Sequence, residues 1–187
     1  MKKLLLMYCL VAIGFACSML SVRAIAAEGF ITIGVPDSAG FAMDRCSVRF
    51  SPKGYVTEML VAFIEGSTKD IRVLAYNFTS VPVASALVDA HKRGVDVQIV
   101  FDRSVQTEKS SALPLIKKAG IPYRIDSTHH IAHNKVILVD NEWIETGSFN
   151  YSPNAENFNG ENALICHSVE GYIQYRVDWE KHWSHSK

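Results

Sequence analysis

An alternation of strand-like and helix-like runs between residues 71 and 125 constrains the fold of this chain more than any other feature. The apolar run 71–78 predicts a buried strand, and Ser80 followed by Pro82 predicts a helix that ends near Gly94. The next predicted elements are a strand at 95–101, a helix at 110–119 and a short strand at 121–125. This order predicts an α/β fold: a single domain with a mixed, largely parallel sheet and helices on both faces.

The segments on either side are less regular. Before the alternation, we expect a loosely ordered segment, a short strand at 47–50 and a helix that opens at Ser51-Pro52. After it, the runs 135–139 and 142–146 flank a turn-prone pair and predict a hairpin. A strand at 163–167 and a helix at 169–183 close the chain. Large side chains recur on one stripe of that helix, which predicts core packing: Tyr172, Tyr175, Arg176, Trp179 and Trp183.

The first 26 residues have the layout of a secretory signal peptide. Lys2 and Lys3 precede an apolar run over 4–20, and the small residues Ala24 and Ala26 suit cleavage after residue 26. An uncleaved membrane anchor is the alternative, because the run is close to the length that spans a bilayer. We therefore expect a periplasmic or secreted protein with a signal peptide at 1–26, an N-terminal extension at 27–45 and one catalytic domain at 46–187.

Charge limits how the exported chain can bind a polyanion. Removal of Lys2, Lys3 and Arg23 from the 19 basic residues leaves 16, against 19 acidic residues, so the formal charge is −3. Proteins that hold nucleic acid over a broad surface carry a stripe of lysine and arginine. Any contact with a polyanion must here be local.

Two cysteines remain after removal of the export segment. Cys46 and Cys166 could pair in an oxidising compartment. The sequence does not place them near each other, so a disulfide and two separate thiols both stay open.

Four polar residues flank the predicted hairpin. Residues two apart on a strand point to the same face, so His133 projects with Lys135. Ser148 likewise projects with Asn150 if the strand after the turn continues through Gly147. A two-residue turn, either at 140–141 or at 141–142, brings all four side chains onto one surface. A three-residue loop would separate them.

Such a surface suits attack on a phosphate diester. Its imidazole can serve as nucleophile or acid, and Lys135, Ser148, Asn150 and backbone N–H groups near Gly147 can stabilise the charge that develops on the phosphoryl oxygens. Gly147 also lets the backbone approach closely. The spacing reads His133-x-Lys135, four residues, Asp140, six residues, then Gly147-Ser148-x-Asn150.

This signature resembles the HKD motif of the phospholipase D superfamily, over a region from about residue 46 to 183. The chain holds one copy of the motif, which is similar to the small bacterial Nuc-type nucleases. The resemblance implies a homodimer in which His133 of one protomer attacks phosphorus and His133 of the other acts as acid and then base. Neither imidazole alone can conveniently do both.

The resemblance also implies a site. The implied catalytic residues are His133, Lys135, Asp140 and Glu161, and Lys135, Gly147, Ser148 and Asn150 would bind the phosphate. Glu161 matches a carboxylate that supports the histidine in similar nucleases. Asp140 belongs to the signature, but its turn position indicates a structural role rather than proton transfer.

No metal or other cofactor is expected. His129, His130 and His133 could suggest a metal site, but no metal-ligand motif accompanies them and Lys135 already supplies positive charge. His129 and His130 are predicted to lie at the rim of the site. The leading hypothesis is a nuclease that acts on DNA, with RNA as a further substrate, and the alternative is a phospholipase or cardiolipin hydrolase. A non-catalytic binding protein is disfavoured because no motif residue is missing.

Overall fold

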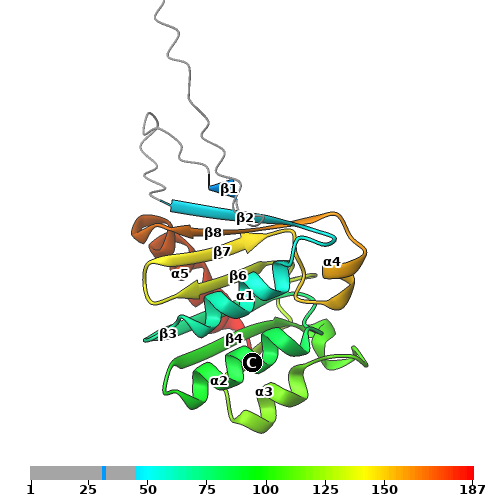
Figure 1. The fold of residues 1–187 in the computed structure, drawn as a ribbon. Helices are drawn as coiled ribbons and strands as arrows, with labels where there is room; N and C mark the ends of the chain where they lie inside the picture. The colour runs from blue at the N-terminus through cyan, green and yellow to red at the C-terminus, as the bar shows by residue number, and fades with distance from the viewer. Residues whose placement is uncertain (1–30, 33–44) are drawn as a thin grey trace, which may run out of the picture.

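The computed structural model describes residues 31–32 and 45–187, so the predicted signal peptide and nearly all of the predicted extension at 27–45 lie outside the described residues. One sheet runs through the described part (Figure 1), with the strand order β1-β2-β8-β7-β6-β3-β4-β5. The strands are β1 (Ile31–Thr32), β2 (Arg45–Ser51), β3 (Asp70–Ala75), β4 (Asp96–Asp102), β5 (Tyr123–Asp126), β6 (Lys135–Val139), β7 (Trp143–Gly147) and β8 (Glu161–His167). The helices are α1 (Val56–Glu65), α2 (Val81–Lys92), α3 (Leu113–Ala119), α4 (Pro153–Asn157) and α5 (Val169–His185), with a 3-10 turn at Arg103–Gln106.

The mixed α/β class is confirmed, but the balance of strand directions differs from the expectation of a largely parallel sheet. Among the described strands, only β3–β4 and β4–β5 pair in parallel, and the other neighbours are antiparallel. The parallel part is the predicted alternation, in which α2 and α3 make the crossovers. The strands β6, β7 and β8 follow one another without a crossover helix over the sheet, so each returns beside the previous one and the pairing becomes antiparallel.

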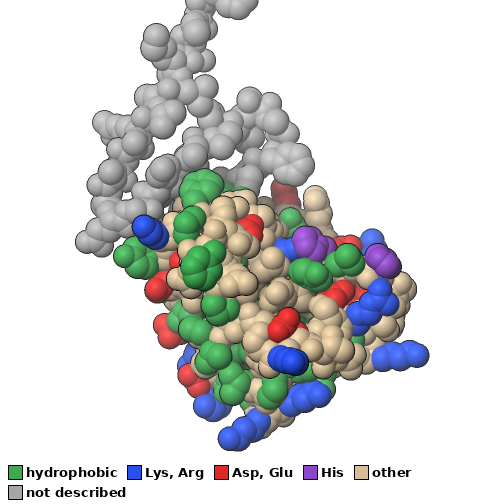
Figure 2. Space-filling model, turned by 90° about the vertical axis from the view of Figure 1, so that its right-hand side faces the viewer, with side chains coloured by type: hydrophobic (Ala, Val, Ile, Leu, Met, Phe, Trp, Pro, Cys, Tyr) green, Lys and Arg blue, Asp and Glu red, His purple; other side chains and the backbone are tan. Residues whose placement is uncertain are grey.

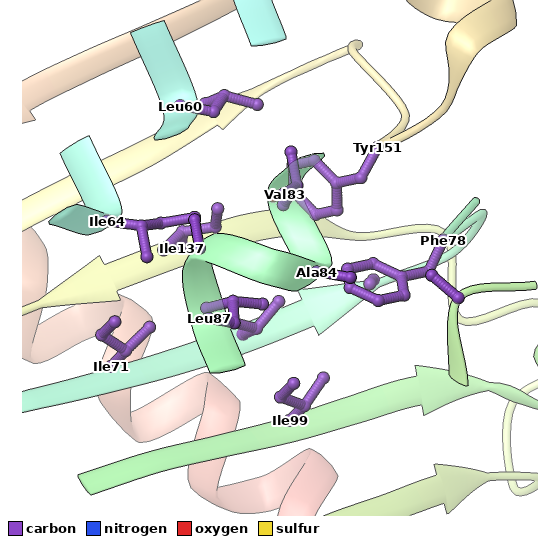
Figure 3. Close-up of a cluster of buried hydrophobic side chains, with 14 of the residues drawn as sticks. Leu60, Ile64, Ile71, Phe78, Val83, Ala84, Leu87, Ile99, Ile137 and Tyr151 are labelled. Carbon is purple, nitrogen blue, oxygen red and sulfur yellow. The ribbon is translucent and has the colours of Figure 1, made fainter. Parts of the chain in front are cut away.

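Helices cover both faces of the sheet, as predicted. In Figure 1, α1, α2 and α3 lie in front of the strands and α5 lies behind them. Residues of β3 point alternately to the two faces of the sheet. Ile71 and Val73 belong to the larger hydrophobic cluster, under α1 and α2 (Figure 3), and Leu74 belongs to the smaller one, under α5. The central strands are therefore buried on both sides, which fixes their register.

Local signals predicted some helix ends and missed others. Helix α2 begins after Ser80, whose Oγ accepts a hydrogen bond from Val83 N, and α3 ends at Gly120 with a φ of 74°. The prediction that a helix opens at Ser51-Pro52 was wrong. Ser51 instead continues β2, where it pairs with Glu161, and α1 begins only at Val56.

The C-terminal helix packs with the predicted stripe. Tyr172 and Trp179 are buried, and Tyr175 and Trp183 pack against them. Arg176 instead joins ion pairs with Asp70 and Glu180. Among the described residues no helix, α5 included, is both long enough and apolar enough to cross a membrane.

A disulfide joins Cys46 to Cys166. These cysteines are register partners on the neighbouring strands β2 and β8. The sequence left open whether these two cysteines form a disulfide, because they lie 120 residues apart and only strand pairing brings them together.

Candidate active site

All the predicted site residues except Asp140 gather at one edge, where four central strands begin or end. Ala75 at the end of β3 pairs with Lys135 at the start of β6. At the same edge, Gly147 ends β7 and pairs with Ala163, near the start of β8. Residues from four segments therefore lie at this edge of the sheet: 76–77, 133–135, 148–150 and 161–162. Figure 2 views the molecule from this side and shows basic, acidic and histidine side chains interspersed.

The hairpin expectation was wrong in its turn length. Val139 pairs with Trp143, so Asp140, Asn141 and Glu142 form a three-residue loop. Asp140 and Asn141 both adopt positive φ, and Glu142 N donates to Val139 O. Carried one residue beyond the ladder, this register sets Lys135 opposite Gly147 rather than Ser148. Ser148 and Asn150 reach the edge because β7 ends at Gly147, and strand pairing does not place them there.

Gly147 is needed for a close backbone contact. A Cβ there would lie 2.1 Å from Asn162 O. The N–H groups of Ser148 and Phe149 donate to that same oxygen, at 3.0 and 3.2 Å. The expectation that backbone N–H groups beside Gly147 bind phosphate is therefore wrong for these two, because β8 already accepts their hydrogen bonds.

His133 and Lys135 form the chemical centre of this edge. Lys135 Nζ lies 2.9 Å from His133 Nδ1 and donates to His133 O at 2.6 Å. The lysine is buried, and the histidine is exposed. Nε2 of His133 makes no hydrogen bond within the described part of the chain, so this nitrogen is free to meet a substrate.

Electrostatics at Lys135 combine two opposed effects. Burial lowers the pKa of Lys135, and the charge of Glu161 partly opposes this shift. Glu161 Oε1 accepts a hydrogen bond from Asn159 Nδ2 at 3.0 Å. No hydrogen bond joins Glu161 to His133 in the residues that the structure describes, so the carboxylate acts here on the lysine. Its predicted support of the imidazole stays a prediction.

The amide and hydroxyl groups complete the edge. Ser148 Oγ donates to Asn162 Oδ1 at 3.2 Å and accepts from Asn162 N at 3.1 Å. Asn150 Oδ1 is buried and has no partner among the described residues, and the same holds for Asn77 Oδ1. The bridge between Phe78 and Tyr151 brings the two asparagine segments together.

Tyr151 fixes the segment that carries Asn150. Its ring packs against Phe78, three residues after the end of β3 (Figure 3), and its hydroxyl donates to Glu145 Oε2 at 2.8 Å. Burial raises the pKa of Glu145 to about 8, although the tyrosine hydrogen bond lowers it. The raised pKa favours the neutral carboxyl at pH 7, which costs less to bury than a carboxylate would.

Tyr76 and Asn77 were not predicted as site residues. The ring of Tyr76 lies 4.5 Å from the ring of His133, and Lys135 Nζ lies 5.3 Å from the tyrosine ring. Their signal was available, because they follow directly after a buried parallel strand, where side chains of α/β sheets commonly bind ligands. Beside them lies a depression of about 470 Å³ lined by Tyr76, Arg103, Thr107, His130 and Ile131, among others.

Asp140 lies away from this edge, at the other end of β6. Its carboxylate accepts hydrogen bonds from Thr68 N, Thr68 Oγ1, Lys69 N and Asp70 N at 2.7–3.1 Å. Burial alone would raise its pKa, but hydrogen bonds from Lys69, Thr68 and Asp70 lower it overall. Asp140 thus fastens the start of β3, and its inclusion among the catalytic residues stays a prediction that rests on the resemblance.

Comparison with known proteins defines the class. Residues 60–183 match the family described as "Cardiolipin synthase, PLD-like domain". "Phospholipase D" of Rickettsia bellii is 35% identical over 72% of this chain and 67% of its own length. "Mitochondrial cardiolipin hydrolase" of Xenopus laevis is 26% identical over 75% of this chain and 67% of its own. Nuc of Salmonella typhimurium, a phospholipase D family member, has 38% identity and a TM-score of 0.73 over 76% of this chain and 95% of its own. The chain therefore belongs to the phospholipase D superfamily of phosphodiesterases.

Proposed function

We propose that this chain is a single-motif, Nuc-type nuclease that hydrolyses DNA, with RNA as a further substrate. The observation that carries the proposal is the exposed imidazole of His133 above the buried ammonium of Lys135, with Nε2 unbonded in the described part of the chain. The similarity to Nuc, which spans 95% of that protein, supports the assignment. The depression lined by Tyr76, whose ring contacts that of His133, is also lined by Arg103, which offers the local basic contact that an acidic chain needs.

The chemistry divides into two displacements at phosphorus. Nε2 of His133 attacks phosphorus, the bond to the leaving oxygen breaks, and a second imidazole protonates that oxygen. Water then attacks the phosphohistidine, its proton passes to the second imidazole, and the P–N bond breaks. Lys135 and the amide of Asn150 stabilise the charge on the oxygens that do not leave. Lys135 thus supplies the positive charge that a metal would otherwise provide.

A homodimer supplies the second imidazole. A two-fold axis repeats one patch on both subunits, so His133 of the partner subunit can face the same phosphorus. Two exposed aromatic side chains flank the site edge: Phe50, 59% exposed, pairs with Asn162, and Phe158, 79% exposed, lies three residues before Glu161. Burial of these rings between subunits would stabilise such a dimer.

Export to the periplasm or the medium fits this activity. The disulfide between Cys46 and Cys166 supports an oxidising compartment, and the signal peptide at 1–26 stays a proposal on sequence grounds.

A phospholipid substrate is the second candidate. It is favoured by the names of relatives, "Phospholipase D" and "Mitochondrial cardiolipin hydrolase". The same displacement serves either diester, so the residues around His133 fit both substrates.

One preparation tests both candidates. Purified protein in excess EDTA is given plasmid DNA, cardiolipin vesicles or phosphatidylcholine vesicles, and sedimentation gives its oligomeric state. We expect DNA cleavage, slow or no lipid turnover and a dimer, and we expect His133→Ala to lower cleavage by at least about 10⁴-fold. Rapid lipid turnover with intact DNA would contradict the nuclease proposal and support a phospholipase instead. A fully active monomer would contradict the proposal that two subunits share one active site.

A further inference from the structure

A second histidine cluster lies at the far end of the loop that carries His133. Asp126, the last residue of β5, is fully buried, and its Oδ2 lies 2.8 Å from Nδ1 of His129. Two residues near the end of α5 approach the same oxygen: Nδ1 of His182 at 2.8 Å and Nε2 of His185 at 3.0 Å. The four candidate ligand atoms all lie within 4.8 Å of one another.

The carboxylate is oriented toward this cluster by its own backbone. Oδ1 of Asp126 accepts from Thr128 N at 3.0 Å and from His129 N at 3.1 Å, which leaves Oδ2 to the imidazoles. Asp126 therefore presents one carboxylate oxygen, Oδ2, as a ligand atom toward the three imidazoles.

Three imidazole contacts to a single carboxylate oxygen make this cluster crowded. Three imidazole nitrogens crowd one carboxylate oxygen whose neighbour already accepts two N–H groups, and ring centroids are only 4.8–5.4 Å apart. A cation among them would give each nitrogen lone pair an acceptor. A tetrahedral zinc ion with bonds of about 2.0–2.1 Å sets its ligand atoms roughly 3.3 Å apart. The separations in this cluster run from 2.8 Å to no more than 4.8 Å, a range that contains this value.

An outer carboxylate supports one of these histidines. His182 turns Nδ1 to the cluster and holds Nε2 3.7 Å from Oδ2 of Asp178, one helical turn earlier. A carboxylate on the far side of a ligating imidazole is a common feature of zinc sites, because it fixes the tautomer. An ion could enter from solvent, since the side chains of His129 and His185 are 47% and 28% exposed.

We propose that Asp126, His129, His182 and His185 bind a divalent transition-metal ion, with zinc the best fit to three imidazoles and one carboxylate. Four protein ligands fill a tetrahedral shell, so the ion is structural and has no part in hydrolysis. It fastens α5 to residues 127–134, the loop that carries His133. The proposal does not rest on the nuclease assignment.

The test measures metal content and stability rather than activity. Full-length protein without a polyhistidine tag is stripped with a chelator, dialysed against zinc and analysed for bound metal and thermal unfolding. We expect about one zinc ion per chain and a Tm raised by roughly 5–10 °C. The double variant His129→Gln/His185→Gln should bind zinc more than about 100-fold less tightly and show no zinc-dependent Tm.

A matched control removes two other histidines. His130→Gln/His167→Gln has the same composition as the test variant but keeps the four ligands, so it should retain the ion. A second measurement uses only the wild-type protein, so misfolding of a variant cannot affect it. Cobalt(II) replaces zinc, and a four-coordinate cobalt site absorbs strongly in the visible range. Wild-type protein without bound zinc, a test variant that keeps its zinc, or a weak six-coordinate cobalt spectrum would overturn the proposal.

Discussion

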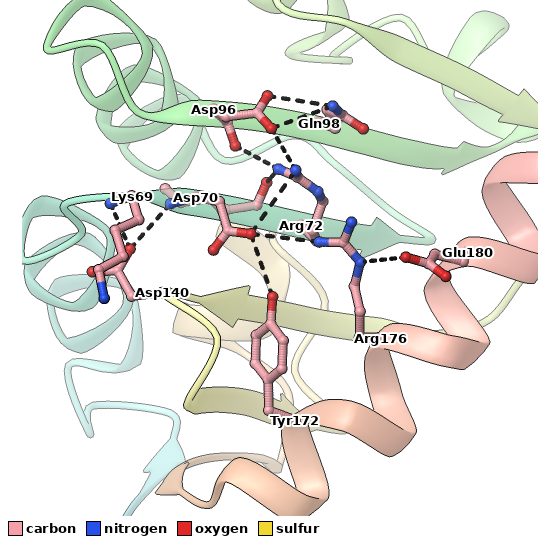
Figure 4. A network of polar contacts seen from close by, with 10 residues as sticks. Lys69, Asp70, Arg72, Asp96, Gln98, Asp140, Tyr172, Arg176 and Glu180 are labelled. Atoms are coloured by element: carbon pink, nitrogen blue, oxygen red, sulfur yellow. Dashed lines mark hydrogen bonds and ion pairs between the residues drawn. The ribbon is translucent and has the colours of Figure 1, made fainter.

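Two polar clusters lie at opposite ends of the central strands, and they differ in how their charges are compensated. At the end away from the site (Figure 4), Arg72 pairs with Asp96 and Asp70, and Arg176 pairs with Asp70 and Glu180. Asp140 adds its hydrogen bonds to the backbone at 68–70 in the same region. Charges of both signs are matched within the chain.

At the site end, Lys135 Nζ lies against an imidazole and a carbonyl, and no carboxylate forms an ion pair with it in the described chain. A buried ammonium without an ion-pair partner costs stability, so its retention points to an anion that comes from outside. The signature therefore serves two purposes: Asp140 stabilises the fold at one end of β6, while His133 and Lys135 are placed for chemistry at the other.

Among the variants that compare the two ends of the central strands, Lys135→Met should have the largest effect and should distinguish the two ends most clearly. We expect kcat/KM for plasmid DNA to fall about 100- to 1000-fold, because one preorganised charge is lost. The Tm should stay the same or rise, since an apolar side chain of similar length replaces a buried charge. Lys92→Met, on an exposed lysine paired with Asp89, is the control and should alter neither quantity. A large fall in Tm with normal activity per folded molecule would assign Lys135 to the fold.

Asp140→Asn should show the opposite pattern. Asparagine tolerates the positive φ at this position, so the variant isolates the carboxylate. We expect unfolding in urea at pH 7 to show a loss of about 1–3 kcal/mol, because backbone donors at 68–70 lose a charged acceptor. The exposed Asp89→Asn should cost less than about 0.5 kcal/mol.

The sign of the pH dependence follows from the lowered pKa of Asp140. Its stabilisation is present above the unfolded value of about 3.9 and disappears as pH falls through the folded value. The difference between wild type and Asp140→Asn should therefore shrink in acid. A fall of more than about 100-fold in the rate per folded molecule, without loss of stability, would instead give Asp140 a catalytic role.

The residues that the sequence could predict were those with local signals. Ser80 and Gly120 mark helix ends by their own backbone preferences, and the spacing of the motif is enough to identify His133 and Lys135. The turn at 140–142 could not be predicted in the same way, since its carboxylate bonds to a segment about 70 residues earlier. The Asp126 cluster was missed for the same reason, because His182 and His185 reach β5 only when α5 folds across the sheet.

Glu161→Gln should have the smallest effect, and it tests what the carboxylate does at the site end. Its charge opposes the burial that lowers the pKa of Lys135, so its removal should lower that pKa further. The alkaline limb of the kcat/KM profile would then move to lower pH, with a loss of up to about 10-fold at pH 7. Glu170→Gln, on the exposed first turn of α5, should leave the profile in place. A shift of the acid limb instead would indicate that Glu161 acts on His133. If neither the pH profile nor the rate changed, Glu161 would have no role in the active site.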